Sequence, residues 1–247
     1  MKIFRADLHI HTVLSPCASL EMSPAKIIEK ALEQNLDLIA ITDHNSTRQC
    51  ALTKRLAERR GLSVLLGCEV NTAEEVHVLC FFKDLKTTRT FQEFMDKHLP
   101  RIPNQPDFLG YQLILDEQEM IVGEEPYFLG SGLHSDIETI GNLVHKLEGI
   151  FIPAHIDRPH NSIFSQLGFL PPGLKTDALQ LSRYADEYKT KIRYNIPTDI
   201  TMICCSDAHY PEEVGSGATR FFMERLSFDE IKLALNRQQG RYSEIEK

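Results

Sequence analysis

The sequence has no apolar stretch near the roughly 20 residues that a membrane-spanning helix needs. It also lacks the apolar segment of a signal peptide, because the chain runs from Met1 straight into the first predicted strand. These two absences argue against a membrane-bound or a secreted protein. We therefore expect a cytoplasmic protein with no membrane partner.

Paired cysteines are missing as well. The six cysteines form no Cys-x-x-Cys motif and do not reach the density of a secreted disulfide scaffold. We expect most of them to be small buried side chains in the reduced form. They are Cys17, Cys50, Cys68, Cys80, Cys204 and Cys205.

Basic residues are fewer than acidic ones. Lys and Arg total 27 and Asp and Glu total 35, which gives a formal net charge of -8. Proteins that grip nucleic acid through its phosphates usually present a broad basic surface. The composition therefore predicts a small substrate, and extended nucleic acid is not expected as a partner.

Apolar residues, in contrast, are sufficient for one sizeable core. They make up 42% of the 247 residues, so we expect a single domain over residues 1–247. Strand-like apolar runs alternate with helical patterns, which is typical of parallel βα units. No internal repeat or low-complexity segment interrupts them.

The alternation breaks between about residues 99 and 132. Pro103, Pro106 and Gly110 precede an apolar run, an acidic turn at Asp116 and a second apolar run that begins at Met120. This pattern predicts an inserted β-hairpin. It is either a surface decoration or a contact in a homo-oligomer, or else a lid or rim over a site.

Two histidines near the start give the first indication of chemistry. His9 and His11 lie in the run Asp7-Leu8-His9-Ile10-His11-Thr12, and side chains two apart on a strand point the same way. Two imidazoles on one face can chelate a metal, although a half-buried strand with a polar face would give the same pattern.

Further metal-type side chains follow other apolar runs. Each of four runs, residues 38–41, 63–66, 150–153 and 202–205, is followed within a few residues by such a side chain. With the run that carries His9 and His11 this makes five cases, and coincidence explains five less easily than one. The residues delivered in this way are His44, Glu69, His155, Asp207 and His209.

In these motifs the chain resembles the PHP family, named for polymerase and histidinol phosphatase domains. The matching segments, in family order, are DLHIHT at 7–12, ITDHN at 41–45, GCEV at 67–70, VHV at 76–78, PAHID at 153–157 and CSDAH at 205–209. The resemblance implies a distorted TIM-like (β/α)7 barrel with an inserted hairpin. It also implies two or three divalent metals, Zn, Mn or Fe, at the C-terminal ends of the strands.

The resemblance also implies a distribution of ligands. His9, His11, Glu69 and Asp207 would hold one metal, and Glu69 would bridge to a second metal held by His77 and His155. His44 and His209 would hold a third. Asp7 and Asp43 adjoin ligands, so we expect them to orient imidazoles through the other ring nitrogen, or to form a salt bridge or a cap.

One position departs from the family pattern. Many members have an Asp or a His shortly after the first motif, whereas this chain has Ser15-Pro16-Cys17. Proline has no donor atom, so Cys17 is the candidate ligand there. As a ligand it would favour zinc over manganese, and the alternative is that it only packs.

The chemistry follows from charge. Two or three divalent ions outweigh Glu69, Asp207 and a Cys17 thiolate, so the pocket would be cationic and would attract a phosphate. The predicted reaction is hydrolysis of a small phosphate ester, such as a nucleotide or histidinol phosphate, by a metal-activated water, with Glu69 and Asp207 as catalytic metal ligands.

Two further side chains are candidates near His155. Arg158 could bind a phosphate oxygen or form a loop salt bridge. His160 could donate a proton to the leaving group or be an ordinary surface histidine.

Two other functions stay open at this point. One is a metal-bound structural or regulatory module without catalysis, and the other is a nuclease that trims the ends of nucleic acid. Inactive members of the family tend to lose ligands, whereas eight of the nine expected positions here carry a standard ligand type, which argues against the first function. The net acidity argues against the second.

Overall fold

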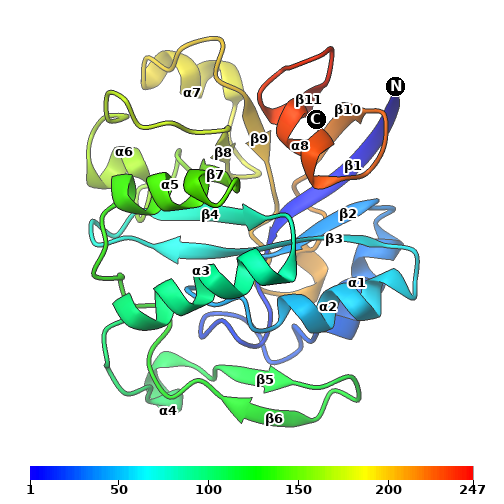
Figure 1. The fold of residues 1–247 in the computed structure, drawn as a ribbon, viewed down its shortest axis with the longest axis vertical. Helices are drawn as coiled ribbons and strands as arrows, with labels where there is room; N and C mark the ends of the chain where they lie inside the picture. Colours follow the sequence, from blue (N-terminus) through cyan, green and yellow to red (C-terminus); the bar gives the residue numbers. More distant parts are fainter. Residues whose placement is uncertain (247) are drawn as a thin grey trace.

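A curled seven-stranded sheet is the centre of the fold in the structure, a computed structural model that describes residues 1–246 (Figure 1). The strand order is β11-β10-β1-β2-β3-β4-β7. The strands are β1 (Lys2–Ile10), β2 (Leu38–Ile41), β3 (Ser63–Asn71), β4 (His77–Phe82), β7 (Ile150–Pro153), β10 (Thr219–Met223) and β11 (Tyr242–Ile245).

Pairing in this sheet is mixed. Strands β1, β2 and β3 are parallel, whereas β4 is antiparallel to both β3 and β7, and β10 is antiparallel to both β1 and β11. The fold is therefore a mixed α/β half-barrel, which agrees with the distorted TIM-like barrel that we expected, although β4 and β10 depart from the parallel βα pattern. The short connection from Thr72 to Val76 explains the difference, because parallel strands need a crossover of a dozen or more residues.

A second, two-stranded sheet borders the open side of the half-barrel. Strands β8 (Leu179–Leu181) and β9 (Met202–Cys204) are parallel. Ile156 N donates to Gln180 O on the β7 side, and His11 N donates to Ala208 O on the β1 side. The small sheet therefore brings the ends of β7, β9 and β1 close together.

Helices cover the outside of the large sheet (Figure 1). The longer ones are α1 (Pro24–Glu33), α2 (Cys50–Glu58), α3 (Leu85–His98), α5 (Ile137–Lys146) and α8 (Phe228–Leu235). Short ones are α4 (Pro106–Leu109), α6 (Ile163–Gln166), α7 (Glu187–Arg193) and the 3-10 turn η1 (Pro211–Glu213). None of the helices within residues 1–246 is both long enough and apolar enough to span a membrane.

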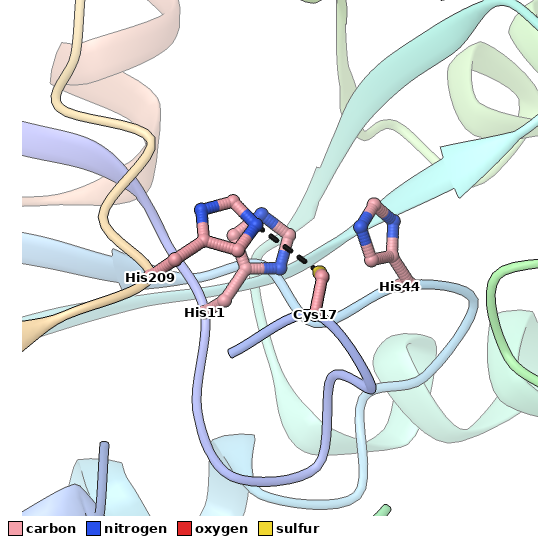
Figure 2. Close-up of side chains that lie close together, drawn as sticks. All are labelled: His11, Cys17, His44 and His209. Carbon is pink, nitrogen blue, oxygen red and sulfur yellow. Dashed lines mark hydrogen bonds between the residues drawn. The ribbon is translucent and has the colours of Figure 1, made fainter. Parts of the chain in front are cut away.

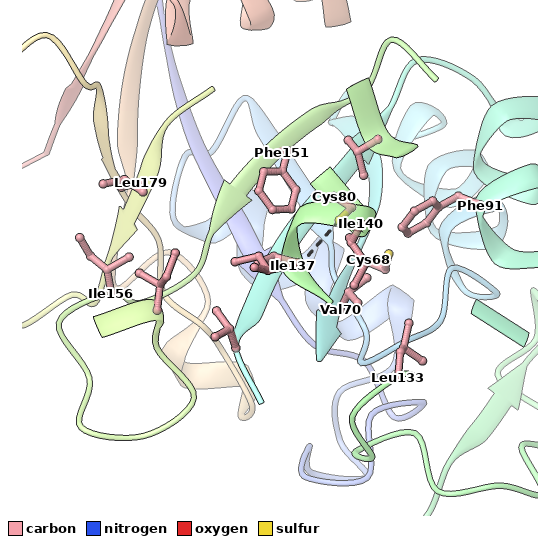
Figure 3. Packing of buried hydrophobic residues seen from close by; sticks show 14 of the residues in the cluster. Cys68, Val70, Cys80, Phe91, Leu133, Ile137, Ile140, Phe151, Ile156 and Leu179 are labelled. Atoms are coloured by element: carbon pink, nitrogen blue, oxygen red, sulfur yellow. Dashed lines mark hydrogen bonds between the residues drawn. The ribbon is translucent and has the colours of Figure 1, made fainter. Parts of the chain in front are cut away.

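Alternation along the strands separates the core into layers. On β3, Val64 and Leu66 pack with the buried faces of α1 and α2, whereas Leu65 joins a cluster on the opposite side of the sheet. A third cluster lies under α3 and α5 and includes Phe91 and Phe151 (Figure 3). Glu69 has the same parity as Leu65, so the strand directs its carboxylate away from the helices.

Residues 99–132 form an excursion that lies at the bottom of the view in Figure 1, and they include the antiparallel strands β5 (Leu113–Leu115) and β6 (Ile121–Glu124). Leu113 N donates to Val13 O, in the loop that follows β1. A Cβ on Gly110 would lie 1.8 Å from Pro16 O, so the two backbones touch. The excursion thus supports the loop that carries Cys17.

Candidate metal centre

The predicted ligands meet at one edge of the sheets. His9 lies in β1 and Glu69 in β3, whereas His11, His44, His155, Asp207 and His209 follow the ends of β1, β2, β7 and β9. His77 is the first residue of β4. Because β4 runs antiparallel to β3, its beginning lies at the edge where β3 ends.

Glu69 is the centre of the cluster and is 1% exposed. Its Oε2 lies 3.3 Å from Nε2 of His9, 3.3 Å from Nε2 of His11 and 3.2 Å from Nδ1 of His44. Its Oε1 lies 3.0 Å from His77 Nδ1 and 3.2 Å from His155 Nε2. One buried carboxylate therefore faces five imidazoles.

Asp207 is a second carboxylate beside the same histidines. Its Oδ1 lies 3.2 Å from Nε2 of both His9 and His11, and those two nitrogens are 3.1 Å apart. Ligand atoms that share one metal at about 2.1 Å lie roughly 3 to 3.5 Å from one another. The spacing in this cluster is thus that of a metal site.

Unpartnered nitrogens support the same conclusion. Nδ1 of His155 is buried and has no hydrogen-bond partner among the described residues, and Nδ1 of His44 has none in hydrogen-bond geometry although Glu69 Oε2 lies 3.2 Å away. Burial lowers the pKa of both imidazoles, which keeps them neutral and their lone pairs free. Neutral imidazole is the form that binds metals.

The electrostatics of the centre also favour a cation. Burial raises the pKa of Glu69, but His77, His9 and His44 outweigh burial and hold that pKa well below its usual range. Burial lowers the pKa of His11, whereas hydrogen bonds and charge from Asp207 and Glu69 raise it to about 10. Two ionised carboxylates thus draw a positive charge to the point where the imidazoles meet, so the residues present fit a divalent metal.

A third donor group adjoins the first two and consists of His11, Cys17, His44 and His209, whose ligand atoms lie within 4.8 Å of one another. Figure 2 shows the Cys17 sulfur facing His209, whose Nε2 is 3.1 Å away. Burial and the charges of Glu69 and Asp207 raise the pKa of the Cys17 thiol. Cys17 would therefore bind a metal by losing a proton that it otherwise keeps.

Two buried side chains that we did not single out orient the first histidines. His9 Nδ1 donates to Gln180 Oε1 at 3.0 Å, and the backbone N of His155 donates to the same oxygen. His11 Nδ1 lies 2.9 Å from Ser15 Oγ, which donates to Asp43 Oδ1. Both contacts leave Nε2 of the two histidines free to point at the carboxylates.

Asp7 and Asp43 form no hydrogen bond to an imidazole among the described residues, so of the roles that we expected for them, orienting the rings is not seen and capping is closer. Asp43 accepts from the backbone N and the hydroxyl of Thr12, and Asp7 accepts from the backbone N of Ser206 and Gly215. Both carboxylates instead fasten the backbone of loops that carry ligands. A buried backbone N–H group in a loop needs a hydrogen-bond acceptor, and these carboxylates provide it.

Backbone strain marks two of the ligand positions. His155 has φ 27° and Asp207 has φ 53°, in the left-handed region that non-glycine residues seldom adopt. Strain of this kind persists where the surroundings fix it, and it gathers at functional sites.

A cleft of about 290 Å³ opens over the cluster, and its lining includes Arg158 and His160. Arg158 Nη1 lies 2.6 Å from Asp207 Oδ2, and its side chain is 42% exposed. His160 is exposed. The structure thus places both candidates beside the cluster, with Arg158 in an ion pair that involves a predicted metal ligand.

Comparison with protein families identifies the fold. The family model described as PHP domain matches residues 7–152, and a second one, described as PHP-associated, matches residues 192–239. The chain belongs to the PHP family. The resemblance read from the sequence motifs is confirmed.

Known proteins resemble this PHP domain over different lengths. Protein MJ1587 of Methanocaldococcus jannaschii, of uncharacterised function, is 33% identical over 103 residues, which is 38% of this chain. The 5'-3' exoribonuclease Rnm of Escherichia coli is 34% identical over 73 residues, 29% of this chain and 24% of its own length.

A solved structure covers nearly the whole PHP domain. The lesion-specific endonuclease PfuEndoQ from Pyrococcus furiosus matches 98% of this chain with a TM-score of 0.78 and 23% identity. A second structure, of Endonuclease Q in complex with a 27-mer duplex substrate that has an abasic lesion at the active site, matches with a TM-score of 0.73 and 24% identity. The chain spans 60% of the length of MJ1587 and 58% of that of PfuEndoQ.

These likenesses overturn one expectation from composition. We expected a small phosphorylated substrate and not extended nucleic acid, but the similar structures are of an endonuclease, one of them bound to a duplex. Net charge is a weak guide to a substrate because it averages over the whole chain. Residues 99–132 alone carry six acidic side chains and one basic one.

Proposed function

We propose that this PHP domain is a metal-dependent nuclease that hydrolyses phosphodiester bonds in nucleic acid. The observation that carries the proposal is the cluster around Glu69, where one buried carboxylate lies within 3.3 Å of five imidazoles in a cleft of about 290 Å³. Stability alone does not require such a cluster, because a salt bridge or a hydrophobic pair would stabilise the same place more simply.

The donor sets suggest how two or three ions would be held. His9, His11, Glu69 and Asp207 form one set, and Glu69 also serves a second set with His77 and His155. Cys17, His44 and His209 would hold a third ion, and this soft set favours zinc. Bound divalent metals polarise a phosphate and lower the pKa of water.

Other side chains in and behind the cleft would bind the phosphate, protonate the leaving group and orient the imidazoles. Arg158, released from Asp207 when that carboxylate binds metal, would bind a non-bridging phosphate oxygen through its guanidinium. The exposed ring of His160 would donate a proton to the departing sugar oxygen. Gln180 and Ser15 would keep the imidazoles of His9 and His11 aimed at the centre.

Local charge supports nucleic acid as the substrate. Residues 158–193 begin at the cleft and carry six basic side chains against three acidic ones, the reverse of the 99–132 excursion. A basic rim at a cleft is typical of surfaces that bind the phosphates of a nucleic acid strand. The likeness to PfuEndoQ supports the same choice.

The test is a side-by-side assay of the metal-loaded chain. Single-stranded and duplex DNA and RNA, a duplex with one abasic site, nucleoside monophosphates and sugar phosphates are compared after reloading with zinc, manganese or iron. We expect cleavage of a nucleic acid to be the fastest reaction, and we expect Glu69→Gln to lose most of it together with bound metal.

Two results would contradict the proposal. Faster turnover of a monophosphate than of any nucleic acid would refute the substrate, and full turnover by Glu69→Gln would refute the metal centre. Zinc content per chain in Cys17→Ser tests the third set separately, because a packing role for Cys17 predicts no loss of zinc.

A further inference from the structure

Tyr184 is an exposed aromatic side chain on a loop that is hydrogen-bonded to the loop of Arg158, which lines the metal cleft. Its ring is 81% exposed, and it follows β8 at the edge where the ligands gather. Ser182, two residues earlier, donates through its backbone N at 2.7 Å and its hydroxyl at 2.5 Å to the carboxylate of Asp157. Asp157 immediately precedes Arg158, so Tyr184 is tied to the loop of the proposed phosphate-binding arginine.

A fixed arginine supports the ring from one side. The guanidinium of Arg183 lies over the ring of Tyr184, 5.0 Å from its centroid. The same guanidinium donates to Ser216 Oγ at 2.7 Å and to Glu213 Oε1 at 2.8 Å. Glu213 also accepts from the backbone N of His209, so the support leads back to a candidate metal ligand.

We propose that Tyr184 is a stacking platform for the base of an unpaired nucleotide next to the scissile phosphate. Bases stack on aromatic side chains whatever their identity, and a cation at the ring adds to the attraction and to the local positive charge. A ring held by Arg183 loses little freedom when a base arrives, and its loop is tied to that of Arg158 through Ser182 and Asp157. The inference rests on the proposed nuclease function and narrows it to single-stranded or unpaired substrate, because base pairs in a duplex already cover their faces.

Tyr188 provides a matched control on the next helix. It is 75% exposed and lies on α7, but within residues 1–246 no guanidinium is found over its ring. Both tyrosines have similar exposure, so general effects of losing a surface aromatic residue should be equal. Only a specific platform makes the two variants differ.

The experiment measures KM and kcat of the metal-loaded chain on single-stranded oligonucleotides. Tyr184→Ala should raise KM about tenfold and change kcat by less than about threefold, whereas Tyr184→Phe, which keeps the ring, and Tyr188→Ala should stay within about twofold of wild type. A set of strands with the saturated base dihydrothymine at successive positions locates the stacked base. At one position the substitution should weaken binding to wild type and leave binding to Tyr184→Ala unchanged.

The outcomes separate this inference from the function on which it rests. Wild type that cuts oligonucleotides, with Tyr184→Ala equal to Tyr188→Ala, overturns the platform and leaves the nuclease proposal standing. A dihydrothymine effect of the same size in wild type and in Tyr184→Ala also overturns it, and indicates that the ring contacts sugar or nothing. Wild type that neither binds nor cuts any strand refutes both proposals.

Discussion

Gln180 joins two candidate metal ligands through one oxygen, because Oε1 accepts from His9 Nδ1 and from the backbone N of His155. Gln180→Met removes this acceptor with little change in volume, so the ring of His9 is no longer fixed. Loss of such a contact typically costs 10- to 100-fold in metal affinity. We expect that loss in a chelator competition titration, and recovery of most of it in Gln180→Glu, which keeps an acceptor oxygen.

Gln49 offers a control for this substitution. It is 1% exposed, and both polar atoms of its side chain lack a hydrogen-bond partner among the described residues. Gln49→Met should therefore leave metal affinity as it is. Wild-type affinity in Gln180→Met would show that Gln180 only fills space.

Arg158 gives a second prediction for a single residue. Removing a charged hydrogen bond to substrate typically costs about 2 kcal/mol, so Arg158→Ala should lower kcat/KM by roughly tenfold or more. Because Arg158 also lies 2.6 Å from Asp207 Oδ2, metal content must be measured in the same variant. Full metal content with unchanged kcat/KM would remove Arg158 from substrate binding.

The histidines and carboxylates could be predicted from the sequence because each lies in a short motif. The side chains that orient them could not be predicted. His9 and Gln180 are separated by 171 positions, and no pattern near His9 indicates its partner. The available signal was a polar residue inside the short apolar run of β8, where a buried amide needs partners.

Among the helices and strands, the sequence indicates helix starts well because an N-cap depends only on neighbouring residues. Ser23 caps α1 with Pro24 at its first position, and Ser227 caps α8, as the sequence indicates. The N-cap of α5 is Asp136, although the preceding Ser135, with Glu138 three residues on, also fits a capping box in the sequence. Strand direction could not be read locally, since β4 fits parallel or antiparallel pairing by composition alone.

The 99–132 excursion touches the loop of Cys17 at the backbone of Gly110. Gly110 has φ 94°, and a Cβ there would meet Pro16 O at 1.8 Å, so any larger residue must push the Cys17 loop away. Gly110→Val should lower zinc content by up to one ion per chain. It should leave the Glu69 cluster filled, as measured by metal analysis of the purified protein.

Gly123 is the matched position for that test. It lies in β6, and an added Cβ would make only ordinary contact with Ile114 at 3.6 Å. Gly123→Val should keep the full metal complement. Equal zinc content in the two variants would show that the excursion does not position Cys17.

Asp177 holds three elements together and makes stability depend on pH. It accepts from His145 of α5, from the backbone N of Phe151 in β7 and from Asn236 at the end of α8. Burial raises the pKa of Asp177, but these hydrogen bonds outweigh burial and lower it below the ordinary value. Its stabilisation is therefore complete above the unfolded pKa near 3.9 and is lost as pH falls through the lower folded pKa.

Asp177→Asn should accordingly reduce the free energy of unfolding by about 2 kcal/mol at pH 7. The difference from wild type should shrink progressively below about pH 4, where the wild-type carboxylate also becomes neutral. Urea unfolding at pH 7 and pH 3 measures both values, with the exposed Asp107→Asn as control. A difference that stays constant with pH would mean that charge at Asp177 plays no part.

For the molecule as a whole, the distribution of charge matters more than its sum. Acidic residues are concentrated in the excursion, whereas residues 158–193 carry an excess of basic ones. In Figure 1 the excursion lies at the bottom and α7 at the top of the molecule. A nucleic acid strand that enters the cleft from the α7 side would avoid the acidic excursion. Salt screens the electric field of the acidic side chains beyond about 8 Å at physiological ionic strength.

Under the proposed nuclease function, this distribution predicts which surface charges interact with a nucleic acid substrate. Lys189 and Arg193 are exposed on α7 and have no ion pair among residues 1–246, and the same holds for Lys86 and Arg89 on α3. For single strands the slope of log affinity against log salt changes by about 0.7 for each phosphate contact. Lys189→Gln with Arg193→Gln should therefore flatten the slope by up to about 1.4, measured as KM between 50 and 200 mM salt.

Lys86→Gln with Arg89→Gln removes the same formal charge from the other helix and should keep the wild-type slope. Equal slopes in the two double variants would mean that nucleic acid senses only the net charge, and that α7 does not border its path.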